Sequence, residues 1–218
     1  MKSAKIPATS QEFPIGKIVC LARNYAEHAR ELGNETPPAP VLFMKPASSV
    51  IGDGDTVRIP TYSQECHYEV ELAVLIGREC RAVSAENAME FVAGYGTAID
   101  MTLRDVQNQL KAKGLPWEIA KGFDSACPLS DFVPASAVAD PHNLRLRLSV
   151  NGMLHQDGSS ADMINRIPQI IAHVSAIFTL EPGDVILTGT PAGVGQVVAG
   201  DVMEAEIVGV ARLTITVR

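Results

Sequence analysis

The sequence has few aromatic residues, a basic minority and no long apolar run. Phe, Trp and Tyr make up 5% of its 218 residues, and 18 Lys and Arg residues stand against 25 Asp and Glu residues, a formal net charge of -7. Phosphate backbones and anionic lipids are bound through clustered Lys and Arg, whereas here the basic residues are scattered among acids. We therefore expect no nucleic acid and no membrane as a partner.

Targeting signals are also missing from the sequence. No apolar stretch approaches the roughly 20 residues that cross a bilayer, and the first 13 residues lack the apolar core of a signal peptide. We therefore expect a cytoplasmic location.

The cysteines form no recognisable motif. Cys20, Cys66, Cys80 and Cys127 include no CxxC pair, which excludes a zinc knuckle and a thioredoxin-type redox motif. Cys66 precedes His67, but neighbouring residues on a strand point to opposite faces, so they make no nucleophile and base pair. We expect reduced and mostly buried thiols.

Phosphate-binding loops are absent as well. The Gly-rich segment 189–195 lacks the Gly-Lys-Ser/Thr ending of a P-loop and does not match the dinucleotide fingerprint. Instead, short apolar runs separated by Gly and Pro turns predict a mixed or mainly antiparallel β core with peripheral helices. We expect residues 1–17 to form an N-terminal arm and residues 18–218 one domain. The expected strands are 17–22, 41–44, 56–59, 69–76, 94–99, 144–150, 185–188, 202–208 and 212–217, and the expected helices are 24–32, 85–93, 103–113 and 163–178.

Two acids begin an otherwise apolar strand. Glu69 and Glu71 precede the run from Leu72 to Ile76, and residues i and i+2 of a strand share a face about 6.6 Å apart. At an effective dielectric of about 20 their repulsion is roughly 2.5 kcal/mol, which a divalent cation would remove. Alternatively, this end of the strand is exposed and both acids are solvated.

A third acid favours the metal. Asp100 follows a small-residue stretch, 94–99, that reads as a strand allowing close backbone approach. Three carboxylates without His or Cys form an all-oxygen set, which suits Mg²⁺ or Mn²⁺ and leaves positions for water and a chelating substrate.

A candidate general base lies near the N-terminus. On a helix, His28 and Glu31 share a face at i and i+3, and a carboxylate can fix the imidazole tautomer while the other ring nitrogen takes a proton. A surface helix with ordinary ion pairs, such as Glu27 with Arg30, is the alternative interpretation.

Six segments together resemble the fumarylacetoacetate hydrolase family, specifically its small members of the acylpyruvase and oxaloacetate decarboxylase type. The similarity extends from about Ile18 to Arg218. The segments are Arg23-Asn24-Tyr25 with His28, Leu42 to Pro46, Glu69 to Gly77, Gly94 to Asp105, Trp117 to Asp124 and Pro182 to Pro191.

The resemblance implies an α+β, mainly β fold, a mixed β-sandwich-like roll with peripheral helices, forming a homodimer. It also implies Mg²⁺ or Mn²⁺ as cofactor and a small-molecule oxo acid as substrate. The implied site has Glu69, Glu71 and Asp100 as metal ligands, His28 and Glu31 as a water-activating dyad on a helix that can act as a lid, Lys121 as the active-site lysine, and Arg23, Asn24, Lys45, Arg104, Gln107 and Thr190 in substrate binding.

One departure from the family pattern is visible. Relatives often show Gln-Asp-Gly followed by Asn-Thr or Thr-Thr, whereas this chain has Gln156-Asp157-Gly158-Ser159-Ser160. Serine keeps the hydroxyl, so the change concerns the choice of acyl group more than the chemistry.

The activity implied by the resemblance is hydrolysis of the C–C bond of acylpyruvates, such as fumarylpyruvate or acetylpyruvate, to pyruvate and a carboxylic acid. Two alternatives act on oxaloacetate: decarboxylation, which gives the same pyruvate enolate, and keto-enol tautomerisation, which needs only stabilisation of an enolate and a proton shuttle. A non-catalytic module that binds a metal or a ligand is an alternative from another class.

Overall fold

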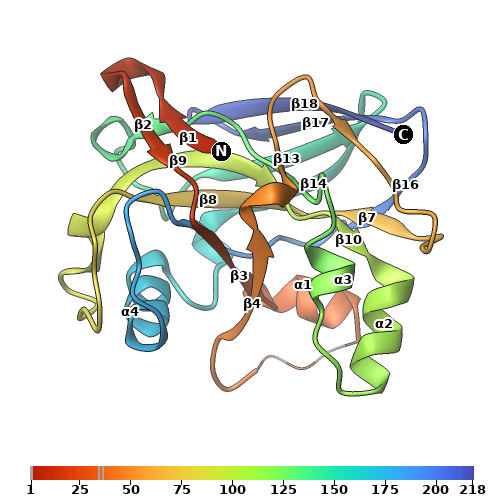
Figure 1. The fold of residues 1–218 in the computed structure, drawn as a ribbon, viewed down its shortest axis with the longest axis horizontal. Coiled ribbons are helices and arrows are strands. Elements are labelled where there is room, and N and C mark those ends of the chain that lie inside the picture. Colours follow the sequence, from red (N-terminus) through yellow and green to blue (C-terminus); the bar gives the residue numbers. More distant parts are fainter. Residues whose placement is uncertain (1, 34, 36) are drawn as a thin grey trace.

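The fold is built on two large β-sheets that pack face to face (Figure 1). The computed structural model describes residues 2–33, 35 and 37–218. The six-stranded sheet has the order β12-β9-β8-β15-β3-β4 and the five-stranded sheet the order β14-β13-β17-β18-β6. Parallel pairs, such as β15 with β3, occur among antiparallel ones. The mainly β, sandwich-like fold predicted from the sequence is confirmed.

The strands of the six-stranded sheet are β3 (Lys17–Ala22), β4 (Val41–Pro46), β8 (Val70–Ile76), β9 (Val92–Ile99), β12 (Val133–Pro134) and β15 (Val185–Leu187). Those of the five-stranded sheet are β6 (Thr56–Val57), β13 (Arg145–Val150), β14 (Met153–Ser159), β17 (Val202–Ile207) and β18 (Ala211–Val217). Smaller sheets contain β1 (Ser3–Ile6), β2 (Gln11–Pro14), β5 (Val50–Ile51), β7 (Cys66–Tyr68), β10 (Thr102–Leu103), β11 (Cys127–Pro128) and β16 (Gly195–Val197).

Strand β8 is buried along its whole length because both of its faces are covered. Leu72 and Val74 belong to the main core, which also contains the inner residues of the five-stranded sheet. Ala73 and Leu75, on the opposite face, belong to a second core cluster. Glu71 shares the alternation of Ala73 and Leu75, so it points away from the core between the two large sheets.

Residues 1–17, expected to form an arm, contain the hairpin of β1 and β2, which packs against the second core cluster. Ile6 and Ile15 are buried there, and the Phe132 N–H donates to the Lys5 carbonyl. The hairpin is therefore tied to the body of the molecule. The division of the chain at residue 17 stays a prediction.

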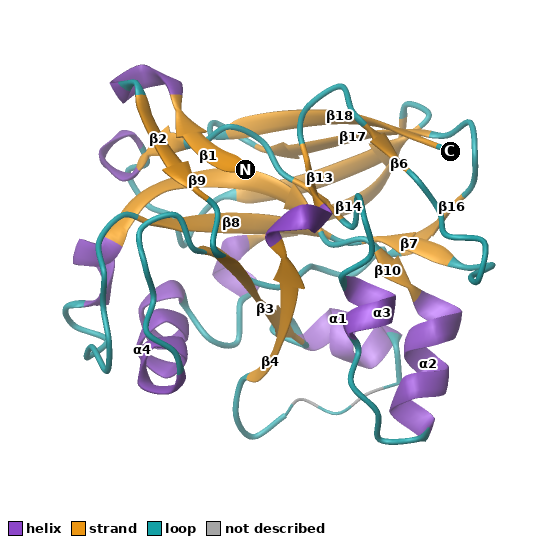
Figure 2. Ribbon diagram, in the orientation of Figure 1, coloured by secondary structure: helices purple, strands orange, loops and turns teal. Residues whose placement is uncertain are grey.

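The helices are α1 (Ala26–Glu31), α2 (Arg104–Ala112), α3 (Glu118–Lys121) and α4 (Ile167–Ile177). The expected helices 24–32, 103–113 and 163–178 are confirmed with shorter bounds, and α3 was not expected. Helices α1, α2 and α3 gather on one side of the molecule, while α4 lies apart from them (Figure 2). In the described part of the chain, no helix is long and apolar enough to cross a membrane.

The expected helix 85–93 is wrong. The segment forms only a 3-10 turn at Ala88–Phe91, and β9 begins at Val92. The Gly77 N–H donates to the Phe91 carbonyl over 2.8 Å, which draws this segment into the sheet. Pairing with a neighbouring strand thus overrides the local helical preference.

Candidate active site

Three carboxylates meet where β8 and β9 pair. The register places Val70 opposite Ile99, so Glu69 lies opposite Asp100, and the Asp100 N–H donates to the Glu69 carbonyl over 2.8 Å. One oxygen from each of Glu69, Glu71 and Asp100 lies within 4.8 Å of the others. The three residues are at most 5% exposed, so the alternative of a solvated strand end is wrong.

Two of these carboxylates have cationic partners. Lys121 Nζ lies 2.9 Å from Glu69 Oε2 and 2.6 Å from Asp100 Oδ2, and Arg104 also bonds to Glu69. Burial alone would raise the pKa of Glu69, but the charges of Lys121 and Arg104 dominate and lower it. Glu69 is therefore ionised at neutral pH.

Glu71 differs from its neighbours. Within the described part of the chain, the Glu71 carboxylate accepts one hydrogen bond, from the Gly189 N–H over 2.6 Å. Burial, together with the charges of Asp100 and Glu69, raises the pKa of Glu71 well above its usual range. The charge of Lys121 and the Gly189 N–H offset this only in part, so the ionised form of Glu71 needs a further positive charge.

The three residues fit a divalent cation of the Mg²⁺ or Mn²⁺ type. They supply hard oxygen ligands that converge from two strands, and Glu71 requires a counter-charge. Glycine is needed at position 189, since its φ is +93° and a Cβ there would lie 2.8 Å from the Asn24 Cβ. The strands and this loop therefore hold the carboxylates in place.

Lys121 is a buried cation in this cluster. Burial would lower its pKa, but the charges of Asp100 and Glu69 raise it overall, so the amine stays protonated at neutral pH. Its ammonium also lies 4.9 Å from the centre of the Phe43 ring. Lys121 can therefore donate hydrogen bonds and stabilise negative charge, and it is a poor general base.

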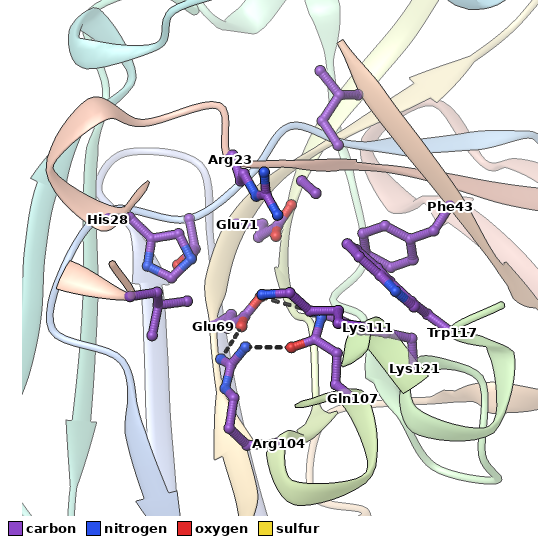
Figure 3. Close-up of a pocket in the computed structure, with 14 residues that line it drawn as sticks. Arg23, His28, Phe43, Glu69, Glu71, Arg104, Gln107, Lys111, Trp117 and Lys121 are labelled. Atoms are coloured by element: carbon purple, nitrogen blue, oxygen red, sulfur yellow. Dashed lines mark hydrogen bonds and ion pairs between the residues drawn. The ribbon is translucent and has the colours of Figure 1, made fainter. Parts of the chain in front are cut away.

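A pocket opens on these side chains and encloses about 420 Å³, its open mouth included. Figure 3 shows Arg23, Arg104, Lys111 and Lys121 among the side chains that line it, with Glu69 and Glu71 at its base. Four cations therefore line the pocket against two carboxylates. The complete lining is Leu21, Ala22, Arg23, His28, Leu32, Phe43, Glu69, Glu71, Arg104, Gln107, Lys111, Trp117, Lys121 and Thr190.

His28 enters the pocket from α1 and is 5% exposed. Its Nδ1 lies 3.4 Å from Glu31 Oε2, and the Gly193 N–H donates to both Glu31 oxygens over 3.1 and 3.3 Å. The structure thus brings together the two residues predicted to form a dyad. Glu31 in turn ties α1 to the loop that follows β15.

Of the residues expected to bind substrate, Arg23, Arg104, Gln107 and Thr190 line the pocket. Gln107 Oε1 accepts a hydrogen bond from Arg104 Nη1 over 2.7 Å, which fixes both side chains. The Thr190 hydroxyl donates to the Val70 carbonyl over 2.8 Å, beside Glu69 and Glu71.

Two expected substrate-binding residues lie outside the pocket lining. Lys45 is completely buried behind Asp100, with Nζ 2.7 Å from Asp100 Oδ1, and it donates to three backbone carbonyls. Asn24 donates to the Thr188 carbonyl over 2.8 Å and accepts from the Asn165 N–H over 2.8 Å. Because both side chains contact protein groups, they help to hold the site together. Their expected role in substrate binding stays a prediction.

Six residues of the pocket lining were not assigned from the sequence: Leu21, Ala22, Leu32, Phe43, Lys111 and Trp117. Phe43 and Trp117 form an aromatic wall, with ring centroids 5.9 Å apart and planes inclined by 50°. Lys111 follows Gln107 by one helical turn of α2. The signal for Lys111 was this spacing of four residues, which puts both side chains on one helix face.

The comparison with known proteins shows the family of the chain. Residues 17–218 match the model of the fumarylacetoacetate (FAA) hydrolase C-terminal domain. The chain belongs to the fumarylacetoacetate hydrolase family. This is a family of enzymes, and the resemblance stated above is confirmed.

Several members of the family are close to this chain. The human mitochondrial oxaloacetate tautomerase FAHD1 is 50% identical over 200 residues, covering 92% of this chain and 90% of its own length. The Escherichia coli K12 oxaloacetate tautomerase YcgM is 49% identical, covering 87% of each chain. A structure of fumarylpyruvate hydrolase from Pseudomonas aeruginosa with Mn²⁺ and pyruvate is 37% identical, with a TM-score of 0.94 and coverage of 99% and 95%.

Proposed function

We propose that the chain is a divalent-metal-dependent enzyme that interconverts the keto and enol forms of oxaloacetate. The observation that carries this proposal is the buried set of Glu69, Glu71 and Asp100 at the base of a pocket with an excess of cations. The relatives that are about 50% identical and named oxaloacetate tautomerases support the choice of substrate.

The three carboxylates would hold Mg²⁺ or Mn²⁺, which supplies Lewis acidity toward a 2-oxo group. Lys121, protonated beside the cluster, would donate a hydrogen bond to the negative charge that develops on the 2-oxo oxygen in an enolate. Arg104, oriented by Gln107, would hold a substrate carboxylate. Phe43 and Trp117 would exclude water from one side of the substrate.

His28 would move the proton that tautomerisation requires. In this step one proton leaves C3 of the keto acid and one is delivered to the 2-oxo oxygen, so that the number of protons is unchanged. An imidazole can both accept and return a proton. Glu31, 3.4 Å from His28 Nδ1, would hold the ring so that its other nitrogen faces the substrate.

Acylpyruvate hydrolysis is the second candidate. The observation that favours it is the pairing of His28 with Glu31. Hydrolysis needs a base that activates water, whereas decarboxylation does not. His28 would deprotonate a water that attacks the distal carbonyl, and cleavage of the C–C bond would expel pyruvate as an enolate. The fumarylpyruvate hydrolase structure supports this candidate. Decarboxylation of oxaloacetate would give the same enolate without the attacking water.

An assay panel separates these activities. Decay of the oxaloacetate enol is followed by ultraviolet absorbance, and pyruvate release is followed by a coupled assay with fumarylpyruvate, acetylpyruvate and oxaloacetate. We expect the enol decay to be the fastest reaction and to fall to the uncatalysed rate in EDTA. Faster pyruvate release from an acylpyruvate would favour the hydrolase, and activity that EDTA does not change would contradict the metal-dependent proposal.

The homodimer and the cytoplasmic location stay predictions. The human FAHD1 relative is named as a mitochondrial protein, so the comparison does not support the cytoplasmic expectation.

A further inference from the structure

Two buried nitrogen atoms, Arg104 Nε and His67 Nδ1, have no hydrogen-bond partner among the described residues. Such unpaired polar atoms are rare in protein interiors because they have lost their contacts with water. The guanidinium Nε is always a donor, and one ring nitrogen of a neutral histidine is an acceptor. The two unpaired atoms are therefore chemically complementary.

Strand pairing places His67 and Arg104 on the same face of a small sheet. In the antiparallel pair of β7 and β10, Thr102 lies opposite His67. Arg104 comes two residues after Thr102, and its N–H donates to the Glu65 carbonyl over 2.7 Å. Residues that are two apart on a strand share a face, so His67 and Arg104 are diagonal neighbours across the pair.

The Arg104 side chain extends past His67. It starts opposite Glu65, and its guanidinium bonds to Glu69 and to Gln107 (Figure 3). The register of β7 with β10 continues that of β8 with β9 without a shift, so residues 65, 67 and 69 share one face. His67 lies midway between the two ends of the arginine. The middle of the Arg104 side chain, which contains Nε, therefore runs along the His67 ring.

The electrostatics of His67 agree with this placement. Burial and then the charge of Arg104 lower its pKa to about 4, against the opposite effect of Glu69 and Asp105. The guanidinium thus acts on the ring at close range. At neutral pH the imidazole is uncharged, so one of its nitrogens can accept a hydrogen bond.

We propose that His67 is a positioning residue for Arg104: its Nδ1 accepts a hydrogen bond from Arg104 Nε and fixes the plane in which the guanidinium meets a substrate carboxylate. Glu69 and Gln107 hold the tip of the side chain, and His67 holds its middle. Orientation matters here because a planar guanidinium binds a carboxylate through parallel hydrogen bonds. This inference rests on the proposed function only in the role of Arg104, and it applies to tautomerisation and hydrolysis alike.

Binding of oxalate to the Mn²⁺-loaded protein, measured by isothermal titration calorimetry, tests this role without any reaction. Oxalate can chelate a divalent cation through two carboxylate oxygens and offer its other oxygens to Arg104. His67→Phe keeps a ring but has no acceptor, whereas His67→Asn places an amide oxygen close to the position of Nδ1. The matched control is His142→Phe, since His142 is also partly buried, has an unpartnered ring nitrogen among the described residues and lies outside the pocket lining.

We expect His67→Phe to weaken oxalate binding about tenfold, while Mn²⁺ affinity stays within about twofold of the wild type. His67→Asn should restore most of the oxalate affinity, and His142→Phe should match the wild type. With oxaloacetate, His67→Phe should raise KM and change kcat little, because Arg104 holds the same carboxylate before and during the reaction. Unchanged oxalate binding in His67→Phe would overturn the proposal. So would an equal loss of Mn²⁺ affinity, which would place His67 in support of the carboxylates.

A double-mutant cycle with Arg104→Lys tests the pairing itself. Lysine keeps the charge but has no Nε–H, so His67→Phe should cost no further oxalate affinity in the Arg104→Lys background. The same tenfold loss in both backgrounds would show that the ring acts independently of Arg104 and would overturn the proposal. His67→Gln, whose amide lies one bond farther from the backbone, should bind oxalate as weakly as His67→Phe and replaces it if the phenylalanine variant does not fold. A wild-type protein that binds Mn²⁺ but not oxalate would contradict the proposed function itself.

Discussion

The Gln156 side-chain nitrogen donates to the Thr190 hydroxyl over 2.8 Å, at a position completely shielded from solvent. The same nitrogen donates to the Pro191 carbonyl, and Gln156 Oε1 accepts from the Val70 N–H. One amide thus joins the strand between the two glutamate ligands to the loop that carries Thr190. Gln156, in the Gln-Asp-Gly segment, therefore supports the end of the pocket that contains Glu69 and Glu71.

Replacement of this amide tests its role. Gln156→Ala removes three buried hydrogen bonds and leaves the Val70 N–H without its partner, at a cost of about 3 kcal/mol. Chemical denaturation should show this loss, and Mn²⁺ binding should weaken because Glu69 and Glu71 flank Val70. Gln196→Ala is the control, since its amide is exposed and bonds to one carbonyl. Equal stability of both variants would contradict the assignment.

Lys121 would compete with a divalent cation for the same carboxylates. The ammonium lies 2.6 Å from Asp100 and 2.9 Å from Glu69, so its charge repels a cation bound to them. The Lys121→Met variant should therefore bind Mn²⁺ at least as tightly as the wild type. If the repulsion exceeds about 1.4 kcal/mol, the Mn²⁺ affinity of the variant should be roughly tenfold higher. Its activity should nevertheless fall by 100-fold or more. Weaker Mn²⁺ binding in this variant would show that Lys121 supports the metal site.

His28 carries the proton transfer in this account. His28→Ala should reduce tautomerisation and acylpyruvate hydrolysis by about 10²–10⁴-fold, and any decarboxylation of oxaloacetate should fall much less because it needs no activated water. Mn²⁺ affinity should stay within about twofold of the wild type, which shows that the carboxylates are intact. His173→Ala, on α4 and outside the pocket lining, is the control. An equal loss of all three activities would contradict the role of the dyad.

Glu71 makes the effect of the metal on stability depend on pH. Its pKa is raised in the metal-free protein by burial and by Asp100 and Glu69, so its contribution to stability is complete below its unfolded pKa of about 4.3 and is lost as pH rises through the folded value. A bound cation needs the ionised form. Mn²⁺ should therefore raise the melting temperature more at pH 7.5 than at pH 5.5.

At one fixed Mn²⁺ concentration, equal to 100 times the Kd at pH 7.5, the stabilisation at pH 7.5 is about 2.7 kcal/mol, or roughly 5–10 °C in Tm. Differential scanning fluorimetry with and without Mn²⁺ at both pH values measures it. The same shift at pH 5.5 and pH 7.5 would show that no proton is displaced from Glu71.

Much of the site was predictable because a physical conflict marks it in the sequence. Two acids at the start of a strand that is otherwise apolar require a counter-charge, and both proved to be buried with Asp100 opposite Glu69. The helical spacing of His28 and Glu31 likewise placed them together.

Other parts depend on contacts that a sequence does not contain. Lys45 was expected in the pocket, but the strand pattern does not specify on which side of Asp100 its side chain lies. The segment 85–93 looks helical by itself, but its hydrogen bond with Gly77 draws it to the sheet, and only a 3-10 turn forms. Gln156 reaches Thr190 across 34 positions of the chain, a contact that only the packing of β14 against this loop creates.

Mn²⁺ titration of the metal-stripped protein tests the central claim most directly, because Glu71 has no other role in this account than to bind the metal. We predict one high-affinity ion per wild-type chain by isothermal titration calorimetry, and a Kd about 100-fold higher or more for Glu71→Gln, which keeps the shape and removes the charge. A Glu71→Gln protein that binds Mn²⁺ as tightly as the wild type would contradict the assignment of Glu69, Glu71 and Asp100 as the metal site.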